Sequence, residues 1–278
     1  LAGRIAAKTG CRLMSEYNNA RMECGAGRVR VDRLPYVVDN ALAALKGTRQ
    51  MILAGAKSPV SFFAYPNKPS VLVPDGCAVT KLATVAEDIE GALESLAAEL
   101  GALNTAPAGV TSLNRPALPT GAVTLDGIAQ LLAALMPEDA VVIDESVTTG
   151  RSFGAHMGGA PRHDWLNLMG GAIGCGLPLA TGAAIGAPQR KVIALEGDGS
   201  AMYTMQALWT MARENLDVTV VVFANRAYRI LRGELANVGA GTPGRKADDM
   251  LTLDRPNLDW LALAKGCGVE AGRAENLD

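Results

Sequence analysis

Hydrophobic and polar positions along the first third of the chain alternate between helix-like and strand-like periods. Apolar residues within 35–46 and 85–100 recur at the spacing of amphipathic helices. Two short apolar runs, 49–54 and 70–73, have the length of buried strands. We therefore expect this part of the chain to be α/β, although it offers few strands for a complete domain.

The same alternation continues in the second part of the chain, where the strands are rich in Val and Ile. The expected elements are a helix over 126–135 that begins after Thr124, a strand over 140–144, a strand over 191–196, a helix over 202–214 and a strand over 218–224. Continuous apolar strands that alternate with helices are typical of a parallel sheet covered on both faces. The predicted fold class is α/β, with two doubly wound parallel-sheet domains.

A segment without apolar periodicity separates these two parts. Residues 106–119 are rich in proline, glycine and small polar residues, which is typical of a linker. We expect one domain over 1–105 and another over 120–278. The length of 278 residues exceeds that of one typical domain, and 49% of the residues are apolar, so two hydrophobic cores are expected.

Composition and charge argue against several classes of function. The formal net charge is −2 and clusters of basic residues are scarce, so we expect no nucleic-acid partner. The five cysteines lie far apart without a Cys-x-x-Cys pair, which disfavours disulfides and a zinc site and favours a cytoplasmic protein. The nearly uncharged window 166–188 is interrupted by small residues and Pro178, so we expect no membrane span.

The residues most suggestive of chemistry follow two strands that are predicted to be neighbours. The tetrapeptide Gly-Asp-Gly-Ser at 197–200 comes directly after one strand, and Asn225 follows the next. Because the carboxyl ends of parallel strands meet at one edge of a sheet, Asp198 and Asn225 are expected to lie together. A Gly-Asp-Gly turn alone would be ordinary turn geometry. Oxygen ligands beside a glycine turn and a helix start suit Mg2+ and a phosphate, so the combination predicts a metal-held phosphate.

These motifs resemble those of the thiamine-diphosphate-dependent enzymes, the superfamily of acetolactate synthase, pyruvate decarboxylase and benzoylformate decarboxylase. One motif is the tetrapeptide at 197–200 with Ala-Leu-Trp at 207–209 and Asn225. The other is the glycine-rich segment 170–178, followed by Ala-Ala-Ile-Gly at 183–186. The chain most resembles acetolactate synthase large subunits, with benzoylformate decarboxylase close behind.

The resemblance implies a role for each part of the chain. Residues 120–278 would be the diphosphate-binding domain, and 1–105 would be part of the central, Rossmann-like domain. The catalytic glutamate of these enzymes belongs to an N-terminal pyrimidine-binding domain that no part of this sequence resembles. We therefore expect a fragment, truncated at both ends and inactive alone.

The resemblance also implies roles for individual residues. Asp198, Asn225 and the backbone carbonyl of Ala227 would bind Mg2+. Ile173 would separate the two rings of the cofactor, and the carbonyl of Gly171 would accept a hydrogen bond from its aminopyrimidine. The full set expected to bind thiamine diphosphate is Thr148, Gly171, Ile173, Gly197, Gly199, Ser200, Asn225 and Ala227.

Three positions near the motifs keep more than one interpretation. Ile230 and Leu231 resemble residues that line the substrate pocket, where a branched side chain would favour pyruvate-sized 2-keto acids, and core packing is an equal alternative. Thr148 is either a contact to the phosphates or a loop hydroxyl that faces water. Arg226 departs from the family pattern, and no role is assigned to it.

Other polar residues are interpreted as lying outside the site. The Gly-Ala-Gly run at 25–27 lacks a preceding apolar strand and a third glycine, so it is not interpreted as a dinucleotide fingerprint. His156 and His163 have no nucleophile beside them and are expected to be loop residues. Glu145 follows a predicted strand, and of two interpretations, a residue that reaches the edge of the site and an exposed carboxylate, the second is favoured.

The resemblance implies decarboxylation or carboligation of a 2-keto acid, most similar to acetolactate synthase and dependent on thiamine diphosphate and Mg2+. The implied partners are the small 2-keto acid and, through the pyrimidine-binding domain of a neighbouring subunit, a homodimer or homotetramer. No pattern in 1–105 indicates whether FAD binds there. Three alternatives stay open: a benzoylformate decarboxylase-like enzyme, a noncatalytic phosphate- or nucleotide-binding α/β protein, and a regulatory descendant of these enzymes.

Overall fold

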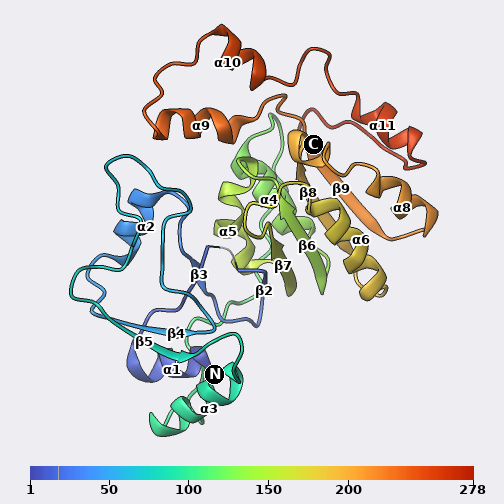
Figure 1. Cartoon of the computed structure of the whole chain (residues 1–278). Helices are drawn as coiled ribbons and strands as arrows, with labels where there is room; N and C mark the ends of the chain where they lie inside the picture. The colour runs from blue at the N-terminus through green and yellow to red at the C-terminus, as the bar shows by residue number, and fades with distance from the viewer. Residues whose placement is uncertain (18) are drawn as a thin grey trace. The chain divides into compact units, whose positions relative to one another are not determined.

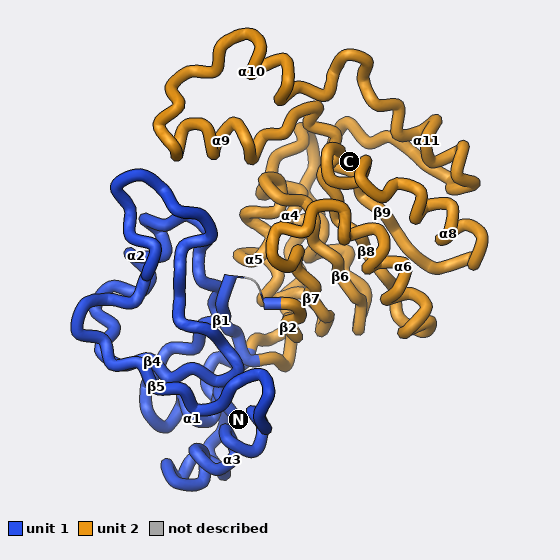
Figure 2. Tube along the Cα trace, viewed as in Figure 1, with its two compact units in different colours: residues 1–19, 29–110 blue, residues 20–28, 111–278 orange. Residues whose placement is uncertain are grey.

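The computed structural model describes residues 1–17 and 19–278, and the chain divides into two units (Figure 2). Unit 1 comprises Leu1–Asn19 and Val29–Val110, and unit 2 comprises Ala20–Arg28 and Thr111–Asp278. The division after Val110 falls inside the segment 106–119. Residues 20–28 lie within the range expected for the first domain, 1–105, but they belong to unit 2.

Unit 1 combines helices with two small parallel sheets. Its helices are α1 (Ala2–Thr9), α2 (Val38–Leu45) and α3 (Ile89–Glu99), and its strand pairs are β1 (Met14–Ser15) with β3 (Asp32–Arg33) and β4 (Gln50–Ala54) with β5 (Ala78–Ala83). The strand expected over 70–73 is wrong, because Val71 makes only an isolated bridge with Val60. Leu72 is the buried member of that run, and it packs in the core that includes α2.

Unit 2 is organised around a five-stranded sheet in the order β2-β7-β6-β8-β9. The strands are β2 (Arg21–Cys24), β6 (Ala140–Glu145), β7 (His163–Asn167), β8 (Val192–Gly197) and β9 (Val218–Phe223). The pairings are parallel except that of β2 with β7, which is antiparallel. The central strands β6 and β8 are buried along almost their whole length, which accounts for their continuous apolar sequences. The predicted α/β class with mainly parallel pairing is confirmed.

Helices cover both faces of this sheet (Figure 1). On one face, α4 (Leu125–Leu135) and α5 (Phe153–His156) contribute to a core with Val142 and Trp165. On the other, α6 (Gly176–Gly186) and α8 (Ala207–Arg213) pack against Val141 and Val192. The remaining helical elements are η1 (Thr149–Ser152), η2 (Met157–Gly159), α7 (Asp198–Ala201), α9 (Arg229–Asn237), α10 (Arg245–Met250) and α11 (Trp260–Gly266).

In unit 2 the predicted start of α4 is confirmed, whereas the helix predicted over 202–214 is not. Thr124 caps α4 as predicted, since its side-chain oxygen accepts a hydrogen bond from the backbone N–H of Gly127 at 3.0 Å. The single helix expected over 202–214 is wrong. The chain instead forms α7 before it, a turn, and then α8, and in that turn Thr204 donates its hydroxyl hydrogen to the carbonyl of Gly174 at 2.7 Å.

Within the described parts of the chain, 1–17 and 19–278, no helix has both the length and the apolar character needed to cross a bilayer.

Candidate functional site

The candidate site lies at the carboxyl-terminal ends of β6, β8 and β9, beside the start of α6. Gly197 ends β8 and is paired with Phe223, which ends β9. Asp198 and Asn225 therefore leave the sheet from neighbouring parallel strands. This edge is where open α/β sheets bind ligands, because the loops that follow the strands converge there.

Asp198 is a buried carboxylate whose described hydrogen-bond donors are backbone amides. The residue is 2% exposed. Oδ1 accepts a hydrogen bond from the N–H of Gly199 at 2.9 Å, and Oδ2 accepts one from the N–H of Arg226 at 2.6 Å. Burial raises the pKa of Asp198, and these amide hydrogen bonds offset part of that rise. Among described residues no cationic side chain forms an ion pair with it, so its charge suits a cation.

The loop after β9 brings backbone groups to the same place. The side-chain oxygen of Asn225 accepts a hydrogen bond from the N–H of Ala227 at 3.0 Å, and the Ala227 carbonyl accepts one from Arg229 at 2.8 Å. Arg226 has φ of 58°, a left-handed conformation that is uncommon for a residue with a side chain. This conformation accompanies the hydrogen bond from its N–H to Asp198. Amide and carbonyl oxygens each have two lone pairs, so Asn225 and Ala227 keep capacity for a further contact.

Asp198, Asn225 and the Ala227 carbonyl make a set of oxygen donors that fits a hard divalent ion such as Mg2+. The set includes only one carboxylate. Accordingly, no group of three or more His, Cys, Asp or Glu suited to a metal occurs within 1–17 and 19–278.

The Gly-Asp-Gly-Ser turn is tightly packed rather than open. Gly199 and Ser200 are buried and lie within α7, which begins at Asp198. A Cβ added at Gly199 would lie 2.7 Å from Cε1 of Tyr228, so this position admits no side chain unless the ring moves. The close approach of Tyr228 explains why glycine is needed at 199.

The glycine-rich segment before α6 has the backbone conformations that its composition predicts. Gly170 and Gly171 have φ of 61° and 72°, and Gly174 has φ of 94°. Ile173 follows this turn with 38% of its surface exposed, and its N–H donates to the carbonyl of Gly171 at 2.8 Å. A large apolar side chain is thus displayed on a backbone that is itself hydrogen-bonded.

The remaining predicted positions are more peripheral. Thr148 is half-buried and directly precedes η1, in the connection that follows β6. Ile230 is half-buried in α9, whereas Leu231 beside it is 46% exposed. Their roles at the site stay predictions.

Glu145 differs in burial from what was expected. It is 1% exposed rather than an exposed carboxylate. One oxygen accepts a short hydrogen bond from the N–H of Gly174, and the other accepts one from the N–H of Gly176 at 2.5 Å. The expectation was wrong because the partners come from a segment about thirty residues further along the chain.

Glu196 is a third buried acid at this edge, after Asp198 and Glu145, and it was not singled out in the sequence. It is 0% exposed and faces Glu145 in the register of β6 and β8. Burial, with the nearby charge of Glu145, raises the pKa of Glu196 to about 9. Burial also raises the pKa of Glu145, against the opposing effect of its amide hydrogen bonds. The available signal was an acidic residue within the last positions of an otherwise apolar strand.

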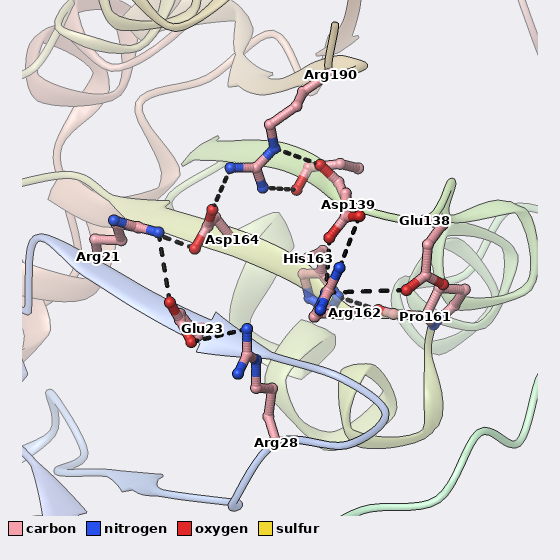
Figure 3. A network of polar contacts seen from close by, with 11 residues as sticks. Arg21, Glu23, Arg28, Glu138, Asp139, Pro161, Arg162, His163, Asp164 and Arg190 are labelled. Atoms are coloured by element: carbon pink, nitrogen blue, oxygen red, sulfur yellow. Dashed lines mark hydrogen bonds and ion pairs between the residues drawn. The ribbon is translucent and has the colours of Figure 1, made fainter. Parts of the chain in front are cut away.

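A different polar cluster occupies the amino-terminal ends of the strands (Figure 3). Asp164 in β7 accepts a hydrogen bond from Nε of Arg21 at 2.9 Å and lies 2.6 Å from Nη1 of Arg190. Arg162 forms an ion pair with Asp139 at 2.7 Å. A cavity of about 490 Å3 beside the cluster is lined by these charged residues.

The electrostatics of this cluster differ from those at the carboxyl-terminal edge. Burial alone would raise the pKa of Asp164, but the hydrogen bonds from Arg21 and Arg190 outweigh burial and keep the pKa below its usual value. The acids and arginines pair with one another, which is the arrangement of a structural network.

The two histidines are not loop residues, contrary to expectation. His163 lies in β7 and is 1% exposed, with Nδ1 at 2.7 Å from the carbonyl oxygen of Pro161. His156 ends α5. Both elements are short and flanked by glycine or proline, so their local sequence resembles that of a loop.

Comparison with known proteins agrees with the geometry of this edge. Residues 148–278 match the family model described as "Thiamine pyrophosphate enzyme, C-terminal TPP binding domain". These residues belong to that family. The thiamine pyrophosphate (thiamine diphosphate) domain therefore contains α6, β8 and β9 and the turn with Asp198.

Relatives extend the similarity over the rest of the chain. The chain is 51% identical over 273 residues to "Putative acetolactate synthase large subunit IlvX" of Mycobacterium tuberculosis, covering 98% of this chain and 52% of that protein. It is 34% identical over 151 residues to benzoylformate decarboxylase of Pseudomonas aeruginosa, covering 54% of this chain and 27% of that one. The chain thus spans about half the length, or less, of these relatives.

Solved structures show the same fold. A thiamine diphosphate-dependent 4-hydroxybenzoylformate decarboxylase of Rhodococcus jostii RHA1 aligns with a TM-score of 0.78 at 23% identity, over 99% of this chain and 53% of that one. At this level of identity the likeness concerns the fold alone.

Proposed function

We propose that this chain is part of an enzyme that uses thiamine diphosphate and Mg2+ to decarboxylate or ligate 2-keto acids, in the manner of an acetolactate synthase. The observation that carries the proposal is Asp198, a buried carboxylate without a described cationic partner, in a domain of the thiamine pyrophosphate family. The similarity to an acetolactate synthase large-subunit relative over 98% of the chain supports the choice of activity.

Three groups of this chain would hold the ion. Asp198 supplies the negative charge, and Asn225 and the carbonyl of Ala227 supply neutral oxygens. The ion would offset the repulsion between Asp198 and a diphosphate, because a divalent cation is the largest local charge in such a site. The amides that already bind Asp198 would keep its oxygens in place as the ion arrives.

Other groups of the domain would position the organic part of the cofactor. The diphosphate would contact the turn at Gly197, Gly199 and Ser200, with Thr148 as a further hydroxyl donor. Ile173 would separate the two rings, and the Gly171 carbonyl would accept a hydrogen bond from the aminopyrimidine. When bound, the cofactor supplies an electron sink for the carbanion that forms on loss of carbon dioxide. The protein's contribution is orientation and exclusion of water.

The half-buried Ile230 and the exposed Leu231 are proposed to line the substrate pocket and to favour pyruvate-sized acids. The proton transfers would require a glutamate from a pyrimidine-binding domain, which we place on a neighbouring subunit of a cytoplasmic homodimer or homotetramer. A benzoylformate decarboxylase-like activity is the second candidate, and it is supported by the 34% identity over 54% of the chain.

Two measurements on the full-length protein test the proposal. Calorimetry should show that thiamine diphosphate binds in the presence of Mg2+ and that a chelator abolishes the binding. Product analysis should then show acetolactate from pyruvate. Benzaldehyde from benzoylformate, without acetolactate, would select the second candidate. Absence of thiamine diphosphate binding, with saturable binding of a nucleotide instead, would overturn both and favour a noncatalytic phosphate-binding protein.

A further inference from the structure

Glu145 is placed where it can control the shape of the glycine-rich segment. It ends β6, and its side chain is 1% exposed. Its two carboxylate oxygens accept hydrogen bonds from the amides of Gly174 and Gly176, and the amide of Cys175 also interacts with it. One side chain therefore binds successive amides at the start of α6.

One of these amides, that of Gly176, needs a partner from outside the helix. It is the first N–H group of α6, which has no carbonyl acceptor within the helix, and the residue before α6, Cys175, provides no side-chain cap. A carboxylate is the strongest acceptor for it, and a negative charge is favoured at the start of an eleven-residue helix. Glu145 thus supplies from β6 the cap that the local sequence of α6 lacks.

The same segment is held from its other side. The hydroxyl of Thr204 donates to the carbonyl of Gly174 at 2.7 Å. A Cβ at Gly174 would lie 2.6 Å from Cβ of Tyr203, so the backbone is pressed against the turn after α7. Glu145 accepts a hydrogen bond from the N–H of Gly174, and Thr204 donates one to the carbonyl oxygen of the same residue. Ile173 is attached directly to this clamped residue.

We propose that Glu145 is a positioning residue that holds 174–176, with help from Thr204, and so fixes the place of Ile173. The inference rests on the proposed function, in which Ile173 contacts the cofactor rings. Glu145 itself would not touch the cofactor or the ion. Its removal should disturb the geometry of the rings while the anchoring of diphosphate by Asp198 and Asn225 persists.

Glu145→Gln is the first test variant, because it keeps the volume of the side chain but presents an NH2 group to one of the two amides. Hydrogen exchange of the cofactor-free, full-length protein, followed by mass spectrometry of fragments covering 172–178, should accelerate about 10-fold or more. Glu138→Gln, an exposed glutamate before the same strand, is the matched control and should leave exchange unchanged.

Steady-state kinetics separate positioning from a purely structural role. In Glu145→Gln, kcat per folded molecule should fall about 10- to 100-fold, because small displacements of reacting groups have effects of this size. The dissociation constant for thiamine diphosphate with Mg2+ should stay within about twofold of the wild-type value. A variant with a lower melting temperature but unchanged kcat would overturn the inference.

A second variant keeps the inference testable if Glu145→Gln does not fold. Thr204→Val is nearly isosteric and removes the hydrogen bond to Gly174. It should accelerate exchange of the same fragments and lower kcat, with smaller effects than Glu145→Gln, and unchanged exchange and kcat would contradict the clamp. Failure of the wild-type protein to bind thiamine diphosphate would overturn the proposed function, whereas exchange in the cofactor-free protein would still test the hold of Glu145 on 174–176.

Discussion

The two ends of the unit 2 sheet treat buried acids in opposite ways. At the amino-terminal end, Asp164 is 4% exposed and pairs with two arginines, Arg21 and Arg190, so its pKa lies below the usual value. At the carboxyl-terminal end, Asp198 is 2% exposed and is bound by backbone amides, and its pKa is raised. The exposed fractions of the two residues are nearly equal, and the hydrogen bonds and charges of the two arginines account for the lowered pKa of Asp164.

This comparison distinguishes an acid whose charge is paired from one whose charge is not. The charge of Asp164 is balanced within the described protein, so it needs nothing further. The charge of Asp198 is stabilised mainly by backbone amides, with a smaller effect of the Arg226 charge and no ion pair among the described residues, which leaves a favourable position for a cation. An acid that is buried, oriented and not neutralised is therefore a better marker of a metal site than an acidic cluster in which arginines are already present.

The largest expected effect is the loss of cofactor binding in Asp198→Ala. Removing the only carboxylate of the proposed ion site should weaken Mg2+-dependent binding of thiamine diphosphate by about 100-fold or more. Loss of a residue that only hydrogen-bonds to a metal ligand already weakens metal binding by about 10- to 100-fold, and loss of the ligand itself should have a larger effect. Isothermal calorimetry of the full-length protein measures this. The exposed Asp217→Ala is the control, with unchanged affinity expected. Equal affinities of Asp198→Ala and Asp217→Ala for thiamine diphosphate would contradict the proposal that the unpaired charge of Asp198 binds the ion.

Gly176→Ala should have the next largest effect, on stability. Its Cβ would lie 2.0 Å from Oε1 of Glu196 and 2.6 Å from Oε2 of Glu145, so both buried carboxyl groups would have to move. We expect the free energy of unfolding to fall by about 2–3 kcal/mol. Gly182→Ala in the same helix meets no atom within 4 Å and should instead raise it by up to about 1 kcal/mol. Denaturant unfolding measures the free energy of unfolding of both variants. Equal values for Gly176→Ala and Gly182→Ala would mean that the side chains of Glu145 and Glu196 are loosely packed around Gly176.

Asp164→Asn tests the amino-terminal end. It leaves Arg21 and Arg190 without their shared carboxylate, and because Arg21 is well exposed we expect a loss of about 2 kcal/mol rather than the larger effect of a fully buried pair. The folded-state pKa is lowered, so this stabilisation is present above the unfolded-state pKa and is lost as the pH falls through the folded-state value.

Urea unfolding should therefore show a nearly constant difference between wild type and Asp164→Asn from about pH 7 to 5, and this difference should shrink as the pH is lowered below about 4, the usual pKa of an aspartate. A difference that persists unchanged well below about pH 4 would mean that the ion pairs do not account for the stability.

The smallest effect is expected from Arg226→Gly, because Arg226 has φ of 58°. Glycine adopts this conformation without strain and keeps the N–H that binds Asp198, but it makes the unfolded chain more flexible. Arg226→Gly should therefore change the free energy of unfolding by less than about 1 kcal/mol. Arg226→Val should lower it by about 2 kcal/mol, because a branched side chain is unfavourable in the left-handed region. Thermal denaturation of both variants would reveal whether the strain is present.

Local sequence was sufficient for much of the fold. The apolar runs of β6, β8 and β9 and the cap at Thr124 are local properties, so these strands, the start of α4 and the parallel pairing of β8 with β9 could be predicted. The neighbouring positions of Asp198 and Asn225 followed from that pairing. The strand expected over 70–73 failed because Val71 is 60% exposed, and an apolar run does not show which of its residues will be covered.

By itself, the sequence determined the alternation of elements, the turn at 197–200 and the pair of residues that leave neighbouring strands, because period and glycine placement act over a few residues. Only the tertiary structure decided that β2 joins the sheet through Arg21 and Asp164, which are 143 positions apart, and that Glu145 is buried against the start of α6. Burial and hydrogen-bond partners depend on which distant segments meet. No local pattern carries that information, since the same acidic residue after a strand is exposed or buried according to what packs over it.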